Sequence, residues 1–209
     1  MKKYLPLFLS TLAVLNVPGQ QQKYLRDNLQ LSLGKSFHGS GDLNGIFFSS
    51  EYGHYFKRRL EISGNVSSTI HHGAFTLLIS APYGNYDASF RYVTAGLQAG
   101  GKIGFAILRS RQHELKMQTG ALFRYQSSSS DGYGITFPPV INYPEPVFTF
   151  RNYEKQNLFT AGYTADLSYT FTTGKNLLLG IKAGFQNDTN GDVISHISFI
   201  AGKRLKGKK

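Results

Sequence analysis

Apolar and polar residues alternate with a period of two through most of the chain, in segments of roughly ten residues. In the segment 158–171, the odd-numbered positions are apolar or aromatic, and the even-numbered positions from Thr160 onward are small or polar. The segment 60–70 repeats the pattern, with Ile62 opposite Glu61 and Ser63. Because successive side chains of a β-strand point to opposite faces, each segment predicts a strand with one apolar and one polar surface.

The pattern predicts eight strands, at 27–36, 46–56, 60–70, 89–107, 113–126, 158–171, 177–186 and 193–204. Short connections at 57–59, 109–112 and 172–176 alternate with mostly longer ones at 37–45, 71–88, 127–157 and 187–192. Short turns at one end and long loops at the other are typical of bacterial outer-membrane barrels. We therefore expect an all-β, eight-stranded antiparallel up-and-down transmembrane β-barrel, with lipid outside, a polar lumen and a long irregular insert at 127–157.

The N-terminus resembles a secretory leader. Two lysines follow Met1, an apolar run extends from Tyr4 to Leu15, and small residues follow up to Gly19. This order predicts a signal peptide over 1–19, with the barrel domain over 20–209. The apolar run is too short to span a bilayer.

Composition narrows the partners. The formal net charge is +11, and the chain contains no cysteine, which excludes disulfides, thiolate metal sites and a lipid anchor on cysteine. An exported chain without a basic helix is not expected to bind nucleic acid. Outer-membrane lipid head groups or lipopolysaccharide phosphates are the expected partners of the basic charge.

Charged residues fall on the polar face of the predicted strands, so they should enter the lumen. They are Glu51, Glu61, Lys102, Glu114, Lys116, Arg124, Asp166 and Lys182. An eight-stranded barrel has an interior just wide enough for side chains. Because an unpaired charge away from water is costly, we expect these groups to pair and plug the lumen.

The connection 71–88 carries an apolar cluster, predicted as a loop patch that contacts a partner outside the cell. It consists of Phe75, Leu77, Leu78, Ile79, Tyr83 and Tyr86. The alternative is that this segment continues the flanking strands beyond the membrane as a rigid hairpin.

A hairpin with a basic turn carries a family resemblance. A strand over 51–56 is followed by Lys57-Arg58-Arg59 and a second strand over 60–64, and the chain closes with a strand over 196–205. These features resemble the small eight-stranded outer-membrane β-barrel proteins of the OmpA-barrel or OmpW-like group, especially those of Bacteroidetes-type Gram-negative bacteria. The resemblance implies an outer-membrane location. Its members act as adhesins, structural proteins, small-molecule channels or lipid-modifying enzymes, so fold alone does not assign function.

One pair of residues is a weak candidate for catalysis. His196 and Ser198 share a strand face, and some eight-stranded outer-membrane lipid A deacylases use a His-x-Ser pair, followed by an asparagine where this chain has Phe199. We interpret the two residues as lumen-lining polar groups and predict no catalytic residue.

Two other motifs do not predict a metal. His71 and His72 are adjacent in the predicted loop 71–88, near His38 of the predicted loop 37–45. Adjacent residues of an extended chain point apart, so the two histidines should not bind one metal together. The segment 188–192 lacks the spacing and the final glutamate of a calcium loop, so a plain turn is predicted. No metal and no cofactor are expected.

The favoured interpretation is a non-enzymatic outer-membrane barrel with a structural or surface-interaction role. The alternatives are a lipid A-modifying hydrolase, a conduit for a small apolar ligand, and a soluble lipocalin-like carrier. In the carrier the apolar faces would point inward. The pattern does not define an oligomeric state.

Overall fold

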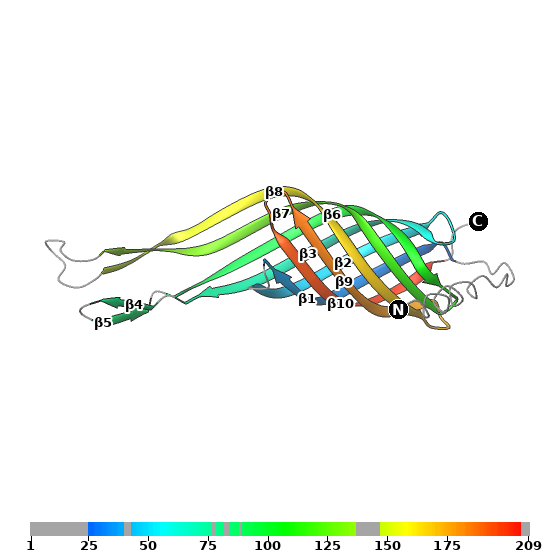
Figure 1. Ribbon diagram of the computed structural model, residues 1–209, viewed down its shortest axis with the longest axis horizontal. Coiled ribbons are helices and arrows are strands. Elements are labelled where there is room, and N and C mark those ends of the chain that lie inside the picture. The colour runs from blue at the N-terminus through cyan, green and yellow to red at the C-terminus, as the bar shows by residue number, and fades with distance from the viewer. Residues whose placement is uncertain are drawn as a thin grey trace, which may run out of the picture.

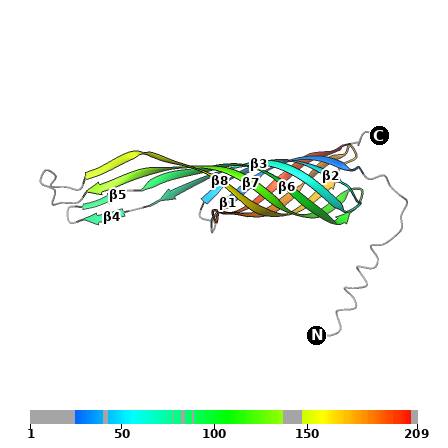
Figure 2. The ribbon, with the colours of Figure 1, turned by 90° about the horizontal axis from the view of Figure 1, so that it is seen from above.

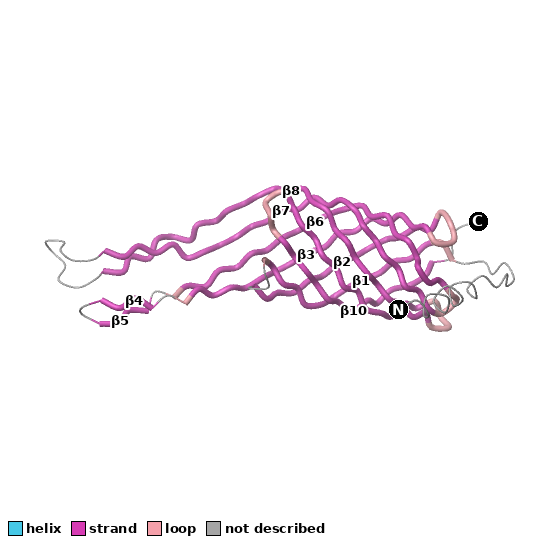
Figure 3. The backbone as a smooth tube through the Cα atoms, viewed as in Figure 1, coloured by secondary structure: helices cyan, strands magenta, loops and turns pink. Residues whose placement is uncertain are grey.

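Eight antiparallel strands close into a barrel (Figures 1 and 3). The computed structural model describes residues 25–39, 43–76, 78–81, 84–87, 89–136 and 147–205. The barrel strands are β1 (Asp27–His38), β2 (Leu43–Tyr55), β3 (Leu60–Phe75), β6 (Phe90–Arg109), β7 (His113–Thr136), β8 (Val147–Thr172), β9 (Leu177–Asp188) and β10 (Val193–Leu205). Their order around the barrel is β1-β10-β9-β8-β7-β6-β3-β2, so the first and last strands seal the sheet. The expected eight-stranded antiparallel fold is confirmed. The predicted signal peptide lies outside the described residues.

Four of the strands continue well beyond the barrel wall. β3, β6, β7 and β8 extend together from one end as a protruding sheet, next to the small hairpin of β4 (Leu78–Ala81) and β5 (Gly84–Asp87) (Figures 1 and 2). β3 pairs with β6 as far as Phe75 opposite Phe90, and β7 pairs with β8 as far as Thr136 opposite Val147. The prediction of an irregular insert at 127–157 was therefore wrong for most of its length, because backbone pairing continues where the apolar alternation fades.

The two faces of the barrel have the polarity that the sequence pattern predicts. Outside, Leu97 is 58% exposed and Phe159 is 81% exposed. Inside, Glu61 and Lys182 are at most 2% exposed. Apolar side chains thus cover the outer surface and charged ones fill the interior. A soluble carrier of the lipocalin sort requires the opposite arrangement, so this alternative is contradicted.

A β-bulge in β6 changes which residues enter the lumen near the barrel end. The pairing of β6 with β7 shifts between Ala106 and Leu108, so Ile107 and Leu108 are both exposed. The extra residue turns the next side chain, Arg109, to the inside, where it is buried. Strict alternation from Phe105 would have placed Arg109 outside.

Both ends of the barrel chain lie on the side of the short turns. Asp27 pairs with Leu205, and the connections 56–59, 110–112 and 173–176 are at this same end. The protruding sheet rises from the opposite end (Figure 2). Among the described residues, no helix is long and apolar enough to cross a membrane.

Candidate functional site in the barrel lumen

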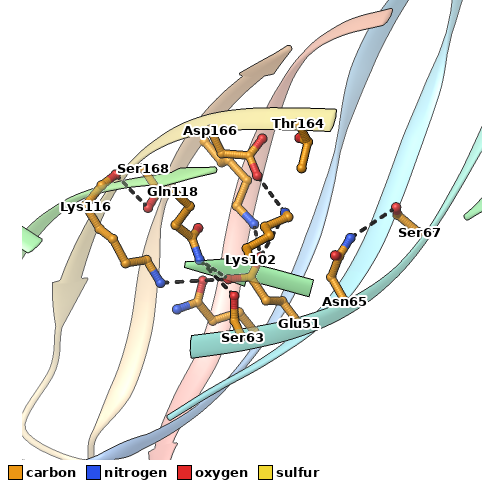
Figure 4. A network of polar contacts seen from close by, with 12 residues as sticks. Glu51, Ser63, Asn65, Ser67, Lys102, Lys116, Gln118, Thr164, Asp166 and Ser168 are labelled. Atoms are coloured by element: carbon orange, nitrogen blue, oxygen red, sulfur yellow. Dashed lines mark hydrogen bonds and ion pairs between the residues drawn. The ribbon is translucent and has the colours of Figure 1, made fainter. Parts of the chain in front are cut away.

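The centre of the lumen is a carboxylate surrounded by cations. Glu51 of β2 accepts a hydrogen bond of 2.9 Å from Lys182 Nζ, and Lys102 Nζ lies 3.4 Å away (Figure 4). The other oxygen of the Glu51 carboxylate, Oε1, lies 3.8 Å from Lys116 Nζ and accepts a hydrogen bond of 2.8 Å from the Gln118 amide. All of these groups are buried. One carboxylate therefore holds three ammonium groups from β6, β7 and β9.

Two further carboxylates balance these cations. Asp166 of β8 pairs with Lys102 at 2.6 Å, and Glu61 of β3 pairs with Lys116 at 2.9 Å. We call the six residues the central network: Glu51, Glu61, Lys102, Lys116, Asp166 and Lys182. They come from six different strands and cross-link the barrel through its interior. Such a network is stable only when its charges stay paired, because each one is costly to leave alone away from water.

A second cluster lies nearer the short-turn end and surrounds Glu114. The Tyr55 hydroxyl donates to Glu114 at 2.8 Å, and Arg204 donates to its other oxygen at 2.9 Å. The Arg109 guanidinium stacks over the Tyr55 ring, 3.4 Å from its centroid, and its Nε lies 3.5 Å from Glu114. Arg109 also donates to the backbone oxygens of Leu25 and Arg58. We call Tyr55, Arg109, Glu114 and Arg204 the lower cluster.

Three members of the lower cluster, Tyr55, Arg109 and Arg204, are not among the residues predicted from the sequence. Arg204 has the same parity as His196 and Ser198 on its strand, so the alternation contained the signal for its inward position. Arg109 offered no such signal, because the bulge in β6 reverses its direction. Tyr55 faces inward although aromatic residues are expected outside, and its hydroxyl explains why burial is tolerated.

Arg124 lies in the lumen but takes part in neither cluster. It is 1% exposed, and its Nη2 donates to Thr69 Oγ1 at 3.3 Å. No carboxylate of the described residues lies within 4 Å of its guanidinium. Of the eight charged residues predicted for the lumen, all are inside, and seven are joined in ion pairs.

Two glycines make room for these side chains. A Cβ added at Gly53 would strike the Glu61 carboxylate, and one added at Gly184 would strike His196 and Asp166. The narrow lumen can hold long charged side chains because these neighbouring strand positions are glycines and have no side chain. The strand glycines thus serve the interior packing.

The weak catalytic candidates are enclosed in the same interior. His196 and Ser198 both face the lumen and are at most 4% exposed. The His196 ring stacks on Phe47 with centroids 3.9 Å apart, and Ser198 Oγ donates to the Lys182 backbone oxygen at 3.5 Å. No hydrogen bond joins the two residues in the described part of the chain. The serine is therefore not activated by this histidine, and neither group reaches the outer surface where lipid would lie.

The histidine pair lies within β3, so its assignment to a loop was wrong. As expected for adjacent strand residues, His71 is buried and His72 is exposed. His71 Nε2 lies 2.9 Å from Ser36 Oγ, and His38 Nε2 lies 3.3 Å from Asp192. These contacts occupy the far end of the lumen, where the protruding sheet begins.

The segment 188–192 forms a tight turn. Asp188 Oδ1 accepts the backbone N–H groups of Asn190 and Asp192 at 3.0 and 3.2 Å, and Gly191 has a φ of 80°. The Asp188 carboxylate therefore accepts hydrogen bonds from the backbone of its own turn, as in an Asx turn.

The predicted apolar loop patch falls mostly outside the described side chains. Leu78 is 69% exposed on β4. Phe75, Ile79 and Tyr86 lie on β3, β4 and β5, but their side chains, like the residues Leu77 and Tyr83, are outside the described part. The backbone favours the alternative interpretation, a hairpin that continues the barrel, over a plain loop.

A closed eight-stranded barrel with an apolar outside and an ion-paired inside is the architecture of small outer-membrane barrels. The fold is similar to crystal structures of Ail, the attachment invasion locus protein of Yersinia pestis, alone and in complex with the heparin analogue sucrose octasulfate. The TM-score is 0.52 for both, with 10% and 11% identity, and the matches cover 87% and 86% of this chain and 100% and 98% of those chains. Neisserial surface protein A gives a TM-score of 0.49 and 11% identity, covering 86% of this chain and 97% of that one.

These similarities concern the fold alone. No protein-family model matches the sequence. No curated protein sequence matches it either. A Bacteroidetes-type source stays a prediction from the sequence.

Proposed function

We propose that the protein is a non-enzymatic integral β-barrel of the outer membrane, with a plugged lumen and a surface-interaction role for its protruding sheet. The observation that carries this proposal is the polarity of the closed barrel, with apolar side chains outside and paired charges within. In a bilayer this arrangement satisfies the backbone groups of the closed barrel wall through strand pairing and places charge away from hydrocarbon.

The plug follows from the central network and the lower cluster. Glu51 attracts three lysines at the middle of the lumen, and Tyr55 with Arg109 fills the short-turn end. Opening a path for solutes would require separating buried ion pairs, and breaking such a pair costs about 3–5 kcal/mol. This cost favours a closed interior over the conduit for a small apolar ligand.

Conductance tests the plug directly. Purified protein inserted into planar bilayers is expected to give no steady open channel, because the central network blocks the lumen. A variant with Glu51→Ala and Lys182→Ala would serve as the positive control, since it removes two long side chains from the centre. Steady porin-like conductance of the unmodified protein would contradict the plug and favour the conduit.

The surface role rests on an unpaired strand edge of the protruding sheet. β9 pairs with β8 only as far as Asp188 opposite Gly162, whereas β8 extends back to Val147. Among the described strands, only β7 pairs with β8 over 147–160. An exposed edge of this length offers backbone donors and acceptors to an extended segment of another chain.

The lipid A-modifying hydrolase is the less favoured alternative. Its support is the shared strand face and the position of Asp166 Oδ1, 3.8 Å from His196 Nε2. The enclosed positions of His196 and Ser198 oppose it. Mass spectrometry of lipid A from cells that express the protein or its His196→Ala variant tests this alternative. We expect identical lipid A in both; a lipid change that depends on His196 would revive the enzyme.

A further inference from the structure

Exposed cations surround the short-turn end of the barrel. They come from the segment before β1, from all three short turns and from the C-terminal end of β10. We call them the basic rim: Arg26, Lys57, Arg58, Arg59, Arg111, Lys175 and Lys203. The feature is spread over five chain segments, so the sequence alone shows only the run at 57–59. The closure of the barrel brings the seven residues to one end.

Acidic groups at this end do not balance the basic rim. Among the described residues they are Asp27, Glu61 and Glu114. Asp27 is occupied by the Tyr52 hydroxyl at 3.0 Å and by His54 Nδ1 at 2.7 Å. Glu61 and Glu114 are buried and pair with Lys116 and Arg204. The rim therefore presents a net positive surface that these carboxylates do not neutralise.

The basic rim begins directly below the apolar band. Lys203 points outward on β10, two residues beyond Ala201, and pairs in register with Leu29 of β1 and Leu177 of β9. Outward-facing aromatic residues, including Phe171, end the apolar surface at the same level. In a barrel this junction of aromatic and basic residues lies at the depth of the lipid head groups. Lys203 points sideways from the barrel wall. Its ammonium group is therefore better placed to contact a lipid head group than to contact a protein in the periplasm.

The far end of the barrel differs in charge. Among the residues there whose side chains are described, the exposed cations are Lys35 and Arg91, and they share that end with the exposed Asp87 and the half-buried Asp192. Since the short turns of outer-membrane barrels face the periplasm, the basic rim belongs to the inner leaflet, which carries phospholipid.

We propose that the basic rim binds the head groups of anionic phospholipids in the periplasmic leaflet. This inference rests on the proposed outer-membrane placement and adds to it a lipid class and a leaflet. Each cation near an anionic surface is attracted to it, and the attraction falls off within a Debye length. The rim would gather anionic lipid and fix the depth and orientation of the barrel.

Spin-label electron paramagnetic resonance tests the proposal on the full-length protein. The protein is folded into phosphatidylcholine bilayers that contain a trace of spin-labelled phosphatidylglycerol or spin-labelled phosphatidylcholine. The fraction of immobilised label gives the relative association constant of each lipid. We expect phosphatidylglycerol to be preferred by about threefold to fivefold at about 0.02 M salt and hardly at all at about 0.5 M salt.

A matched pair of variants assigns the preference to the rim. Arg111→Gln with Lys175→Gln removes one arginine and one lysine from two turns of the basic rim. Lys35→Gln with Arg91→Gln removes the same charges from the far end. The rim variant should lose about half of the preference, and the control should keep it.

Failure of this inference and failure of the proposed function give different results. If the protein inserts, as shown by a heat-modifiable gel band, but both lipids associate equally, the lipid site is wrong and the membrane barrel stands. Equal losses in the two variants would also overturn the rim as the site. If no heat-modifiable band forms in any bilayer, the outer-membrane placement itself fails.

Discussion

Glu51 is the residue on which the interior depends most. It lies within 4 Å of three ammonium groups, and Lys102 and Lys116 are each held by a second carboxylate. Lys182 has no other carboxylate within that distance among the described residues. Removing the charge of Glu51 therefore leaves Lys182 buried without a counter-ion, whereas the other two lysines keep one. A substitution that removes the Glu51 charge should therefore lower the stability of the fold mainly through Lys182.

Glu51→Gln is expected to lower the free energy of unfolding by about 3–5 kcal/mol, because an uncompensated ammonium stays buried. The fraction of heat-modifiable barrel measured against urea concentration reports this loss. Asp87→Asn, an exposed carboxylate on β5, is the matched control and should change little. Combining Glu51→Gln with Lys182→Met should recover part of the loss. Equal urea midpoints for Glu51→Gln and the control would show that the central network does not stabilise the fold.

The strands differ in what their outward faces contact. In the barrel wall, β8 presents Tyr163, Leu167 and Phe171 to the outside, all more than one third exposed. Beyond the wall, β8 presents polar residues such as Asn157, also exposed. One continuous strand face therefore changes from apolar to polar where it leaves the barrel. In the membrane placement we propose, this change marks the boundary of the bilayer on the protruding side.

Leu97→Arg should test the lipid-facing assignment of β6. An arginine facing hydrocarbon at mid-bilayer depth costs about 2–4 kcal/mol, so the yield of folded barrel in bilayers should fall strongly. Asn157→Arg, on the protruding sheet, should fold like the unmodified protein. Equal yields of the two variants, measured by heat-modifiable migration, would mean that Leu97 does not face lipid.

At the scale of the whole molecule, the two ends of the barrel are unlike each other. One end carries three short turns and the basic rim, and the other carries the protruding sheet (Figures 1 and 2). The orientation we propose places the sheet outside the cell and the rim in the periplasm. A free strand edge outside and a lipid-binding rim inside would divide the two contacts between the two sides of one membrane.

The absence of cysteine in the chain allows this orientation to be measured. Single variants Asn157→Cys and Lys175→Cys, expressed in cells, are treated with a maleimide that does not cross membranes. We expect intact cells to label Asn157→Cys only, and lysed cells to label both, because the two residues lie at opposite ends. Labelling of Lys175→Cys on intact cells would reverse the orientation, and labelling of neither after lysis would indicate that the sites are covered.

By itself, the sequence determined the number of barrel strands, their faces and the end at which the short turns lie. The reason is that side chains alternate with a period of two, which is a local property that each strand carries alone. The assignments of Leu97 to the outside and Glu61 to the inside therefore held, as did the inward direction of Arg124.

The tertiary structure decided which charges meet. Lys182 reaches Glu51 across 131 positions of sequence, and the alternation gives no register between distant strands, because that depends on how the sheet closes and staggers. The same closure gathers the basic rim from separate segments. The bulge that turns Arg109 inward and the pairing that extends β7 and β8 beyond the barrel are properties of backbone hydrogen bonding, which the polarity of side chains does not encode.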